Sequence, residues 1–145
     1  MTQSVARALP GEFIHITTDP WTEPFWQAAK EERLVAAQCE CCATFRMPPT
    51  PYCPNCQSQT TKWPQLSGRG SIYSFAVCDR SPYPGVEDFT YIPVVVELDD
   101  APGIRLVSNL IGVTPHEVFI GMPISVAFNP INEGWKYPIF EKAQG

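Results

Sequence analysis

Four cysteines form two Cys-x-x-Cys pairs, a residue type and spacing that bind metal ions. The pairs are Cys39 with Cys42 and Cys53 with Cys56, and ten residues separate them. Each pair lies on a tight turn, and the intervening segment is long enough to run out and back, so four thiolates can converge on one tetrahedral zinc ion. A segment this short cannot bury a core of its own, so zinc would supply most of its folding free energy. The spacing therefore predicts one structural zinc ion per chain.

The predicted zinc site leaves no room for catalysis by the metal. A catalytic zinc keeps one ligand position open for water, whereas four thiolates fill all four positions. Cys41 is an extra thiol in the first turn, and the spacing favours Cys39 with Cys42 because that pair mirrors the second one. Cys78 and His116 could suggest a nucleophile and a base. Cys78 has the pattern of a small buried side chain on a strand and His116 lies in a predicted helix cap, so no catalytic residue is predicted.

Length and charge narrow the classes of function. The chain has 145 residues, which fits one domain or two small modules, and its net charge is −5 with no basic block. Phosphate binding needs concentrated Lys and Arg, so nucleic acid is not the expected partner. No apolar run reaches the length of a membrane span and the first ten residues do not form an export signal, so we expect a cytoplasmic protein with reduced thiols and no membrane partner.

A short helix is expected at residues 21–33, after an extended arm at 1–20. Thr22 is the expected cap, and Pro24 suits the first turn. Phe25 and Trp26 share one side of this helix. That aromatic side either packs on the chain's own ribbon or anchors a partner protein, since large exposed apolar patches mark interfaces.

The rest of the chain is expected to be a ribbon followed by a barrel. Strands are expected around the cysteine turns at 34–38, 44–47 and 60–66, and Gly68-Arg69-Gly70 forms a hinge. Longer strands, rich in residues that suit a half-buried pleated surface, are expected at 71–78, 92–98, 104–111, 123–128 and 135–140, with a helical turn at 114–117 after the third.

Three strands, a short helix and two strands are the order of a five-stranded Greek-key barrel of the OB type. A β-sandwich is the alternative, and five strands are few for two sheets. We therefore predict a mainly β protein, with an arm at 1–20, the helix and zinc ribbon at 21–66 and the OB barrel at 67–145.

These parts resemble the DUF35 family of zinc-ribbon OB-fold proteins over residues 21–141. The resemblance rests on Pro24-Phe25-Trp26, the four cysteines, Gly68-x-Gly70-x-Ile72-Tyr73, Gly121-Met122-Pro123 and Pro138-Ile139-Phe140. It implies a rubredoxin-like ribbon and a non-catalytic accessory subunit of acyl-CoA enzymes.

The resemblance also implies the partner. This would be a thiolase-fold subunit, such as a thiolase-like retro-aldolase that shortens steroid side chains, in a heteromeric complex of which a heterotetramer is one expected form. In some cases the partner is a MaoC-type hydratase. The nucleophile would lie on the partner, and acyl-CoA would meet this chain only indirectly.

Two positions depart from the family pattern. The family usually has Gly after the second cysteine of each pair, and here Ala43 and Gln57 stand there. A left-handed backbone at these residues costs roughly 1–2 kcal/mol each. This leaves open a looser ribbon or weaker zinc binding.

The segment between the first two barrel strands, residues 80–91, is the strongest candidate for a binding surface, because loops of OB barrels often bind ligands. Tyr83, Phe89 and Tyr91 offer apolar area, and Arg80 could contact an anionic group. The loop either folds its aromatic side chains onto its own barrel or lies against the partner's active-site mouth or the acyl-CoA chain.

Two other functions remain as alternatives. Zinc ribbons and OB barrels also bind nucleic acid, although residues 71–145 hold only Arg80, Arg105, Lys136 and Lys142 as cations. A stand-alone enzyme or thiol redox protein is the other alternative, and activity of the isolated zinc-loaded chain on acyl-CoAs would support it.

Overall fold

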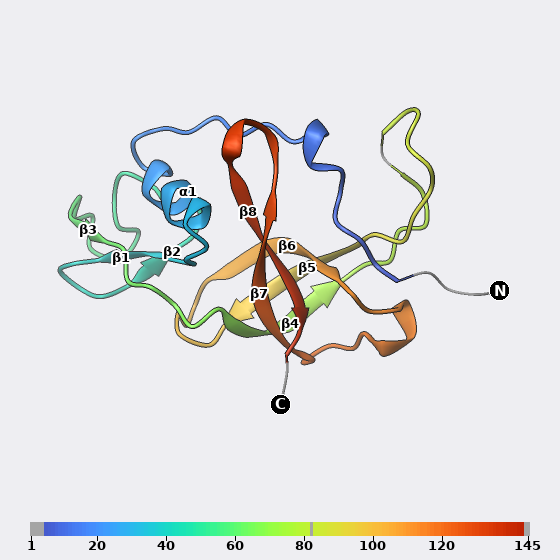
Figure 1. The fold of residues 1–145 in the computed structure, drawn as a ribbon. Helices are drawn as coiled ribbons and strands as arrows, with labels where there is room; N and C mark the ends of the chain where they lie inside the picture. The colour runs from blue at the N-terminus through green and yellow to red at the C-terminus, as the bar shows by residue number, and fades with distance from the viewer. Residues whose placement is uncertain (1–4, 82, 144–145) are drawn as a thin grey trace.

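The structure, a computed structural model, describes residues 5–81 and 83–143. Figure 1 shows a barrel, a small ribbon at one end of it, and a helix beside the ribbon. Helix α1 is Glu23–Lys30, and a 3-10 turn in the N-terminal arm, η1, is Gly11–Phe13. No helix among the described residues is long and apolar enough to span a membrane.

The ribbon is a three-stranded antiparallel sheet. Its strands are β1 (Ala37–Cys39), β2 (Phe45–Arg46) and β3 (Thr61–Lys62), in the order β2-β1-β3. The strands are only two or three residues long. Such short ladders contribute few hydrogen bonds, so the sheet depends on the groups that join its turns.

The barrel has five strands and is closed. They are β4 (Arg69–Phe75), β5 (Ile92–Leu98), β6 (Arg105–Ile111), β7 (Pro123–Pro130) and β8 (Lys136–Lys142). Their order is β4-β5-β6-β8-β7, and β4 pairs with β7 to close the ring. Neighbouring strands are antiparallel except β6 and β8, which are parallel. This is the predicted OB topology, and the closed ring excludes the β-sandwich.

Two 3-10 turns connect the later strands. The turn η2 (Pro115–Glu117) lies between β6 and β7, where the sequence predicted a helical turn, and η3 (Asn132–Gly134) joins β7 to β8. The Glu117 carboxylate accepts hydrogen bonds from the Thr114 backbone N–H at 3.5 Å and from the Thr114 hydroxyl at 3.3 Å. The first is the capping-box bond that the sequence pattern indicated, and both hold the start of η2.

One hydrophobic core joins the barrel to the helix and ribbon. Alternate residues of the strands point inward, and Val94, Val96 and Phe140 are at most 1% exposed. Phe25 of α1 and Leu34, just before the ribbon, belong to the same buried cluster. Packing between the two parts therefore fixes the ribbon at one end of the barrel.

The helix begins differently from the prediction. Thr22 was expected to cap it, but its side chain makes no cap hydrogen bond. Instead the Asp19 carboxylate accepts bonds from the backbone N–H groups of Trp21 (2.9 Å) and Thr22 (2.8 Å). The bond from Thr22 is the main cause that lowers the pKa of Asp19. The Asp19 carboxylate therefore holds the turn that leads into α1, and the prediction that the Thr22 side chain caps the helix was wrong.

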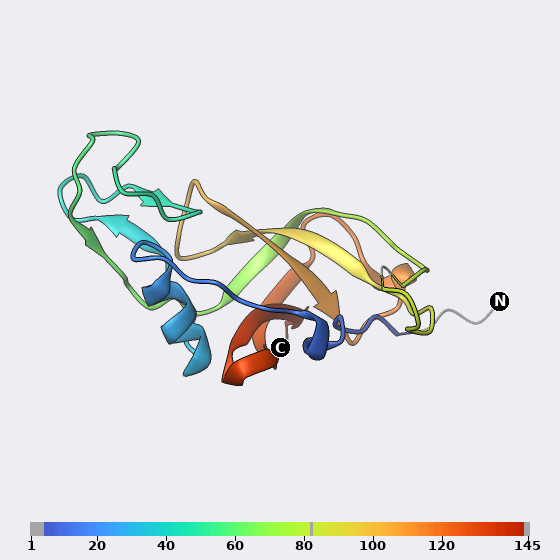
Figure 2. The same cartoon turned by 90° about the horizontal axis from the view of Figure 1, so that it is seen from above.

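The N-terminal arm is extended and docked along the barrel (Figure 2). The backbone of Ala6 exchanges hydrogen bonds with the segment after β6, at 2.7 Å to the carbonyl of Val113 and 3.0 Å from the N–H of Gly112. Further along, the Asn132 side chain donates to the carbonyl of Glu12 at 2.6 Å. The first four residues of the predicted arm lie outside the described residues.

Candidate metal centre and apolar groove

The sulfur atoms of Cys39, Cys42, Cys53 and Cys56 all lie within 4.8 Å of one another. The Sγ atoms of Cys39 and Cys56 are 3.5 Å apart, and those of Cys42 and Cys53 are 3.6 Å apart. A tetrahedral zinc ion with Zn–S bonds of about 2.3 Å requires neighbouring sulfurs about 3.8 Å apart. The four residues therefore fit one zinc ion, and they are the four that the sequence predicted.

Backbone N–H groups in both turns point at the sulfur atoms. The N–H of Cys41 donates to the Sγ of Cys39, and the N–H of Asn55 donates to the Sγ of Cys53, each at 3.4 Å. The two turns therefore have the same geometry. Such bonds stabilise a thiolate, which is the form that binds a metal.

The residue after each Cys-x-x-Cys pair has the expected left-handed backbone conformation. Ala43 has φ 63° and Gln57 has φ 62°, both in the left-handed region. Their N–H groups close the turns, at 3.0 Å to the carbonyl of Cys39 and 2.9 Å to the carbonyl of Cys53. Non-glycine residues therefore adopt the strained conformation that the turn requires.

Cys42 is prepared for metal binding by its neighbours. Hydrogen bonds from the side chain of Asn55 and from Thr44 lower the pKa of the Cys42 thiol to about 5. A thiolate is therefore favoured at neutral pH. Cys41, by contrast, is exposed, and its sulfur contacts the hydroxyl of Ser58 at 3.3 Å, outside the cluster of four. This agrees with the choice of Cys39 as the partner of Cys42.

A buried arginine lies on the same face of the ribbon as the metal site. Arg46 is 5% exposed, its Nε donates to the carbonyl of Thr50 at 3.0 Å, and its Nη2 donates to the hydroxyl of Thr61. In the ladder Thr61 stands opposite Cys39. Within the described part of the chain Arg46 forms no ion pair with a carboxylate. Four thiolates with Zn²⁺ bound would carry a net charge of −2, opposite in sign to the Arg46 guanidinium.

The aromatic residues of the predicted binding loop contact their own chain. Phe89 is 6% exposed, and the Arg7 guanidinium lies 4.9 Å from its ring centroid. Tyr83 stacks on Phe13 of the arm with ring centroids 4.8 Å apart. Of the four candidate binding residues of this loop, Arg80 is exposed, whereas Tyr83 and Tyr91 are half-buried and Phe89 is buried against the chain itself.

The aromatic side of α1 also packs inward. Phe25 is 6% exposed and meets Trp26 edge to face, with ring centroids 5.0 Å apart. Trp26 is only half-buried and reaches the wall of a groove that also includes Tyr91. A partner surface formed by the six candidate residues remains a prediction; they are Phe25, Trp26, Arg80, Tyr83, Phe89 and Tyr91. Phe25 and Phe89 are buried within this chain.

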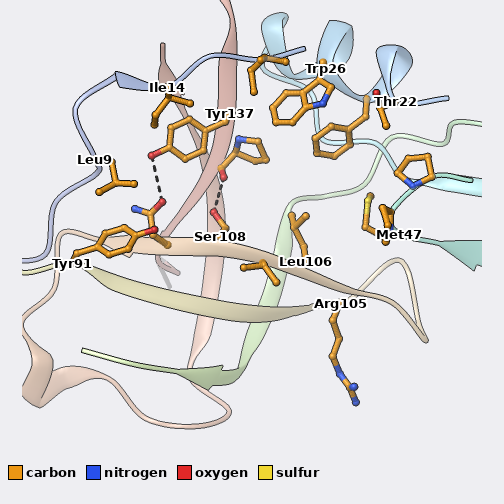
Figure 3. A pocket seen from close by; sticks show the side chains of 17 residues that line it. Leu9, Ile14, Thr22, Trp26, Met47, Tyr91, Arg105, Leu106, Ser108 and Tyr137 are labelled. Carbon is orange, nitrogen blue, oxygen red and sulfur yellow. Dashed lines mark hydrogen bonds between the residues drawn. The ribbon is translucent and has the colours of Figure 1, made fainter. Parts of the chain in front are cut away.

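The groove lies between the arm, α1, the turn after β2, and strands β6 and β8 (Figure 3). Its volume is about 620 Å³, and most of its walls are apolar, including Leu9, Ile14, Trp26 and Leu106. Sequence patterns did not predict it because several segments, far apart in the sequence, form it. Phe25, Trp26 and Tyr91 gave the sequence signal, as aromatic residues of the predicted partner surface that line the groove.

A tetrathiolate ribbon followed by a closed five-stranded barrel makes the chain a zinc-ribbon OB-fold protein. Two family models match it: "ChsH2, rubredoxin-like zinc ribbon domain" at residues 26–61 and "ChsH2, C-terminal OB-fold domain" at residues 63–129. A chain of the solved structure "Ltp2-ChsH2(DUF35) aldolase" is 33% identical, with a TM-score of 0.80 over 90% of this chain and 100% of that chain. The protein belongs to the DUF35 family.

Curated relatives carry two kinds of name. A "Probable enoyl-CoA hydratase alpha subunit" of Thermomonospora curvata is 38% identical over 82% of this chain, which spans only 37% of that protein's length. A "DUF35 domain-containing scaffold protein" of Methanocaldococcus jannaschii is 29% identical over 74% of this chain and 77% of its own length. These names describe an enzyme subunit and a scaffold.

Proposed function

We propose that the protein is a non-catalytic accessory subunit of a heteromeric acyl-CoA enzyme with a thiolase-fold partner. Its likeness to a chain of an Ltp2-ChsH2 aldolase over the whole of that chain carries the proposal. The scaffold and hydratase names of its relatives support a subunit that serves more than one kind of acyl-CoA enzyme. Carbon–carbon bond cleavage, of a steroid side chain or a fatty acyl chain, is the reaction we assign to the complex.

The chemistry of the described residues supports a non-catalytic role. The four thiolates that could bind zinc fill its coordination sphere, so the metal would stabilise the ribbon and activate no water. Cys78 is half-buried and pairs through its backbone with Tyr91, while His116 lies in η2. The nucleophile of the complex therefore belongs to the partner.

Two loops at the barrel end away from the ribbon form the proposed partner surface. Figures 1 and 2 both place the loop that contains Arg80 and the segment around η2 at this end. Just after η2, Phe119 and Ile120 are 56% and 62% exposed. Two adjacent large apolar side chains exposed to this extent are typical of a protein interface. The sequence prediction missed them because they lie beside a strand that needs apolar residues.

A double substitution, Phe119→Asp with Ile120→Asp, is expected to weaken binding of the thiolase-fold subunit at least about ten-fold, because charges would be buried at the interface. The isolated chain should keep its thermal stability, since both side chains are exposed. Affinity is measured by calorimetry with the purified subunit.

The matched control is Tyr52→Asp. Tyr52 is 55% exposed and lies between β2 and β3 of the ribbon, which Figure 1 shows at the other end of the barrel. The Tyr52→Asp variant should bind the thiolase-fold subunit with the same affinity as the unaltered chain. If Tyr52→Asp abolishes binding while the double variant binds normally, the partner contacts the ribbon end and the proposed surface is wrong.

A further inference from the structure

We infer that the groove binds a neutral, elongated, mostly apolar ligand whose carbonyl oxygen accepts a hydrogen bond from Asn109. The inference concerns this chain alone, so its outcome is independent of the proposed partner. It rests on a cavity and on a buried amide that lacks a partner at the wall of that cavity.

The groove exists because two parallel strands separate. β6 and β8 pair only at Leu110 with Phe140 and at Ile111 with Glu141. Nearer the ribbon they diverge, and α1 and the arm border the space between them (Figure 3). The volume of about 620 Å³ is within the range of roughly 300–1,000 Å³ typical of small-molecule sites. An apolar ligand there would remove both its own surface and the groove walls from water.

Asn109 lies on β6 at the wall of the groove and is 2% exposed. Its Oδ1 accepts a hydrogen bond from the Tyr137 hydroxyl at 3.3 Å, the dashed line that starts at Tyr137 in Figure 3. Its Nδ2 is buried and has no hydrogen-bond partner among the residues that the structure describes. Buried amides in folded proteins are almost always paired, so the free N–H calls for an acceptor from outside the chain.

The neighbouring polar groups determine which kind of ligand fits. Burial raises the pKa of Tyr137 to about 12, so its phenol stays protonated and keeps donating to Asn109. The Ser108 hydroxyl donates to the carbonyl of Pro138 at 2.6 Å. The amide oxygen and the Ser108 hydroxyl are therefore engaged, and the free amide hydrogen selects an acceptor such as a ketone, ester or amide carbonyl.

The ligand is neutral because no cation points into the groove. Among the residues that the structure describes, Arg105 is the single charged residue on its wall, and its side chain extends away from the other labelled residues (Figure 3). Its guanidinium lies 3.8 Å from the ring centroid of Tyr73, and its Nε lies 3.4 Å from the Glu97 carboxylate. A free carboxylate in the groove would lose its hydration without gaining a counter-charge, which is strongly unfavourable.

The test uses the full-length zinc-loaded chain and three probes with eleven carbons: 6-undecanone, undecane and undecanoate. Each displaces the neutral fluorophore N-phenyl-1-naphthylamine in a competition titration. The ketone should bind about ten-fold more tightly than the alkane, because it adds one hydrogen bond to a buried donor. Undecanoate should bind more weakly than the ketone. Equal affinities of ketone and alkane, absence of binding, or tighter binding of undecanoate would overturn the inference.

Asn109→Leu removes the donor and keeps an apolar side chain of similar size. It should bring the ratio of ketone to alkane affinity to about one and leave alkane binding intact. Asn129→Leu is the matched control, because Asn129 lies on β7 outside the groove and its amide donates to the carbonyl of Pro130. This control should keep the ratio. A ratio that survives in Asn109→Leu would exclude the assigned donor.

A spectroscopic readout makes the test independent of how the variant folds. In ¹H–¹⁵N spectra of the unaltered chain, the side-chain amide resonances of Asn109 should shift on addition of 6-undecanone and not of undecane. Shifts of the same size with both probes, or with neither, would contradict the hydrogen bond.

Discussion

A Cys53→Ser variant is expected to lose its zinc and the ordered structure of the ribbon. Cys53 is 1% exposed, and its sulfur is one of the four that converge. Structural zinc contributes roughly 10–16 kcal/mol in small zinc-binding modules, far more than strands of two or three residues can replace. The barrel has its own closed hydrogen-bond ladder, so its strands should stay paired. Metal content by mass spectrometry and amide spectra of both parts measure the two effects.

Cys41→Ser is the matched control in the same ribbon. Its sulfur is exposed and lies outside the cluster of four, so this variant should retain one zinc ion and an unchanged ribbon spectrum. Retention of a full zinc equivalent by Cys53→Ser, or its loss from Cys41→Ser, would show that the ligands have been wrongly assigned.

Gly68→Ala is expected to lower the free energy of unfolding of the barrel by about 2–5 kcal/mol. Gly68 precedes β4 with φ +83°, and a Cβ there would collide with the Cγ1 of Val126 on β7. The left-handed backbone contributes roughly 1–2 kcal/mol and the overpacking roughly 1–3 kcal/mol. The site is also where β4 and β7 close the ring. Denaturant unfolding followed by tryptophan fluorescence measures the change.

Gly103→Ala separates the backbone contribution to the loss of stability from the contribution of overpacking. Gly103 has φ +89°, but a Cβ there would meet nothing within 4 Å in the described structure. Only the backbone cost of roughly 1–2 kcal/mol should appear. If both variants lose the same stability, close approach to Val126 does not constrain the barrel.

Features set by local chemistry were predictable from the sequence. The spacing of the cysteines identified the ligand set, and the glycine usual at these positions in the DUF35 family implied the left-handed backbone of Ala43 and Gln57. Residue types that suit a half-buried pleated surface predicted the barrel strands, and in β5 (Ile92–Leu98) every second residue does enter the core. Their order then identified the OB topology.

Features that depend on contacts between distant segments were not predictable in this way. The Thr22 side chain does not cap α1, because its hydroxyl accepts a hydrogen bond from the N–H of Asp19 in the turn before the helix. The docking of the arm through Ala6 likewise depends on residues more than a hundred positions away. The groove is formed by several segments that are far apart in the sequence, so no local pattern marks it or the unpartnered amide of Asn109.

We propose that this chain supports catalysis carried out by another subunit. The most direct test of this proposal is carbon–carbon bond cleavage of an acyl-CoA substrate, measured for the isolated zinc-loaded chain, for the thiolase-fold subunit alone, and for the two co-purified. We predict turnover by the complex and none by this chain alone. Turnover by the isolated chain at the rate of the complex, or an unchanged rate for the partner when this chain is absent, would contradict the account.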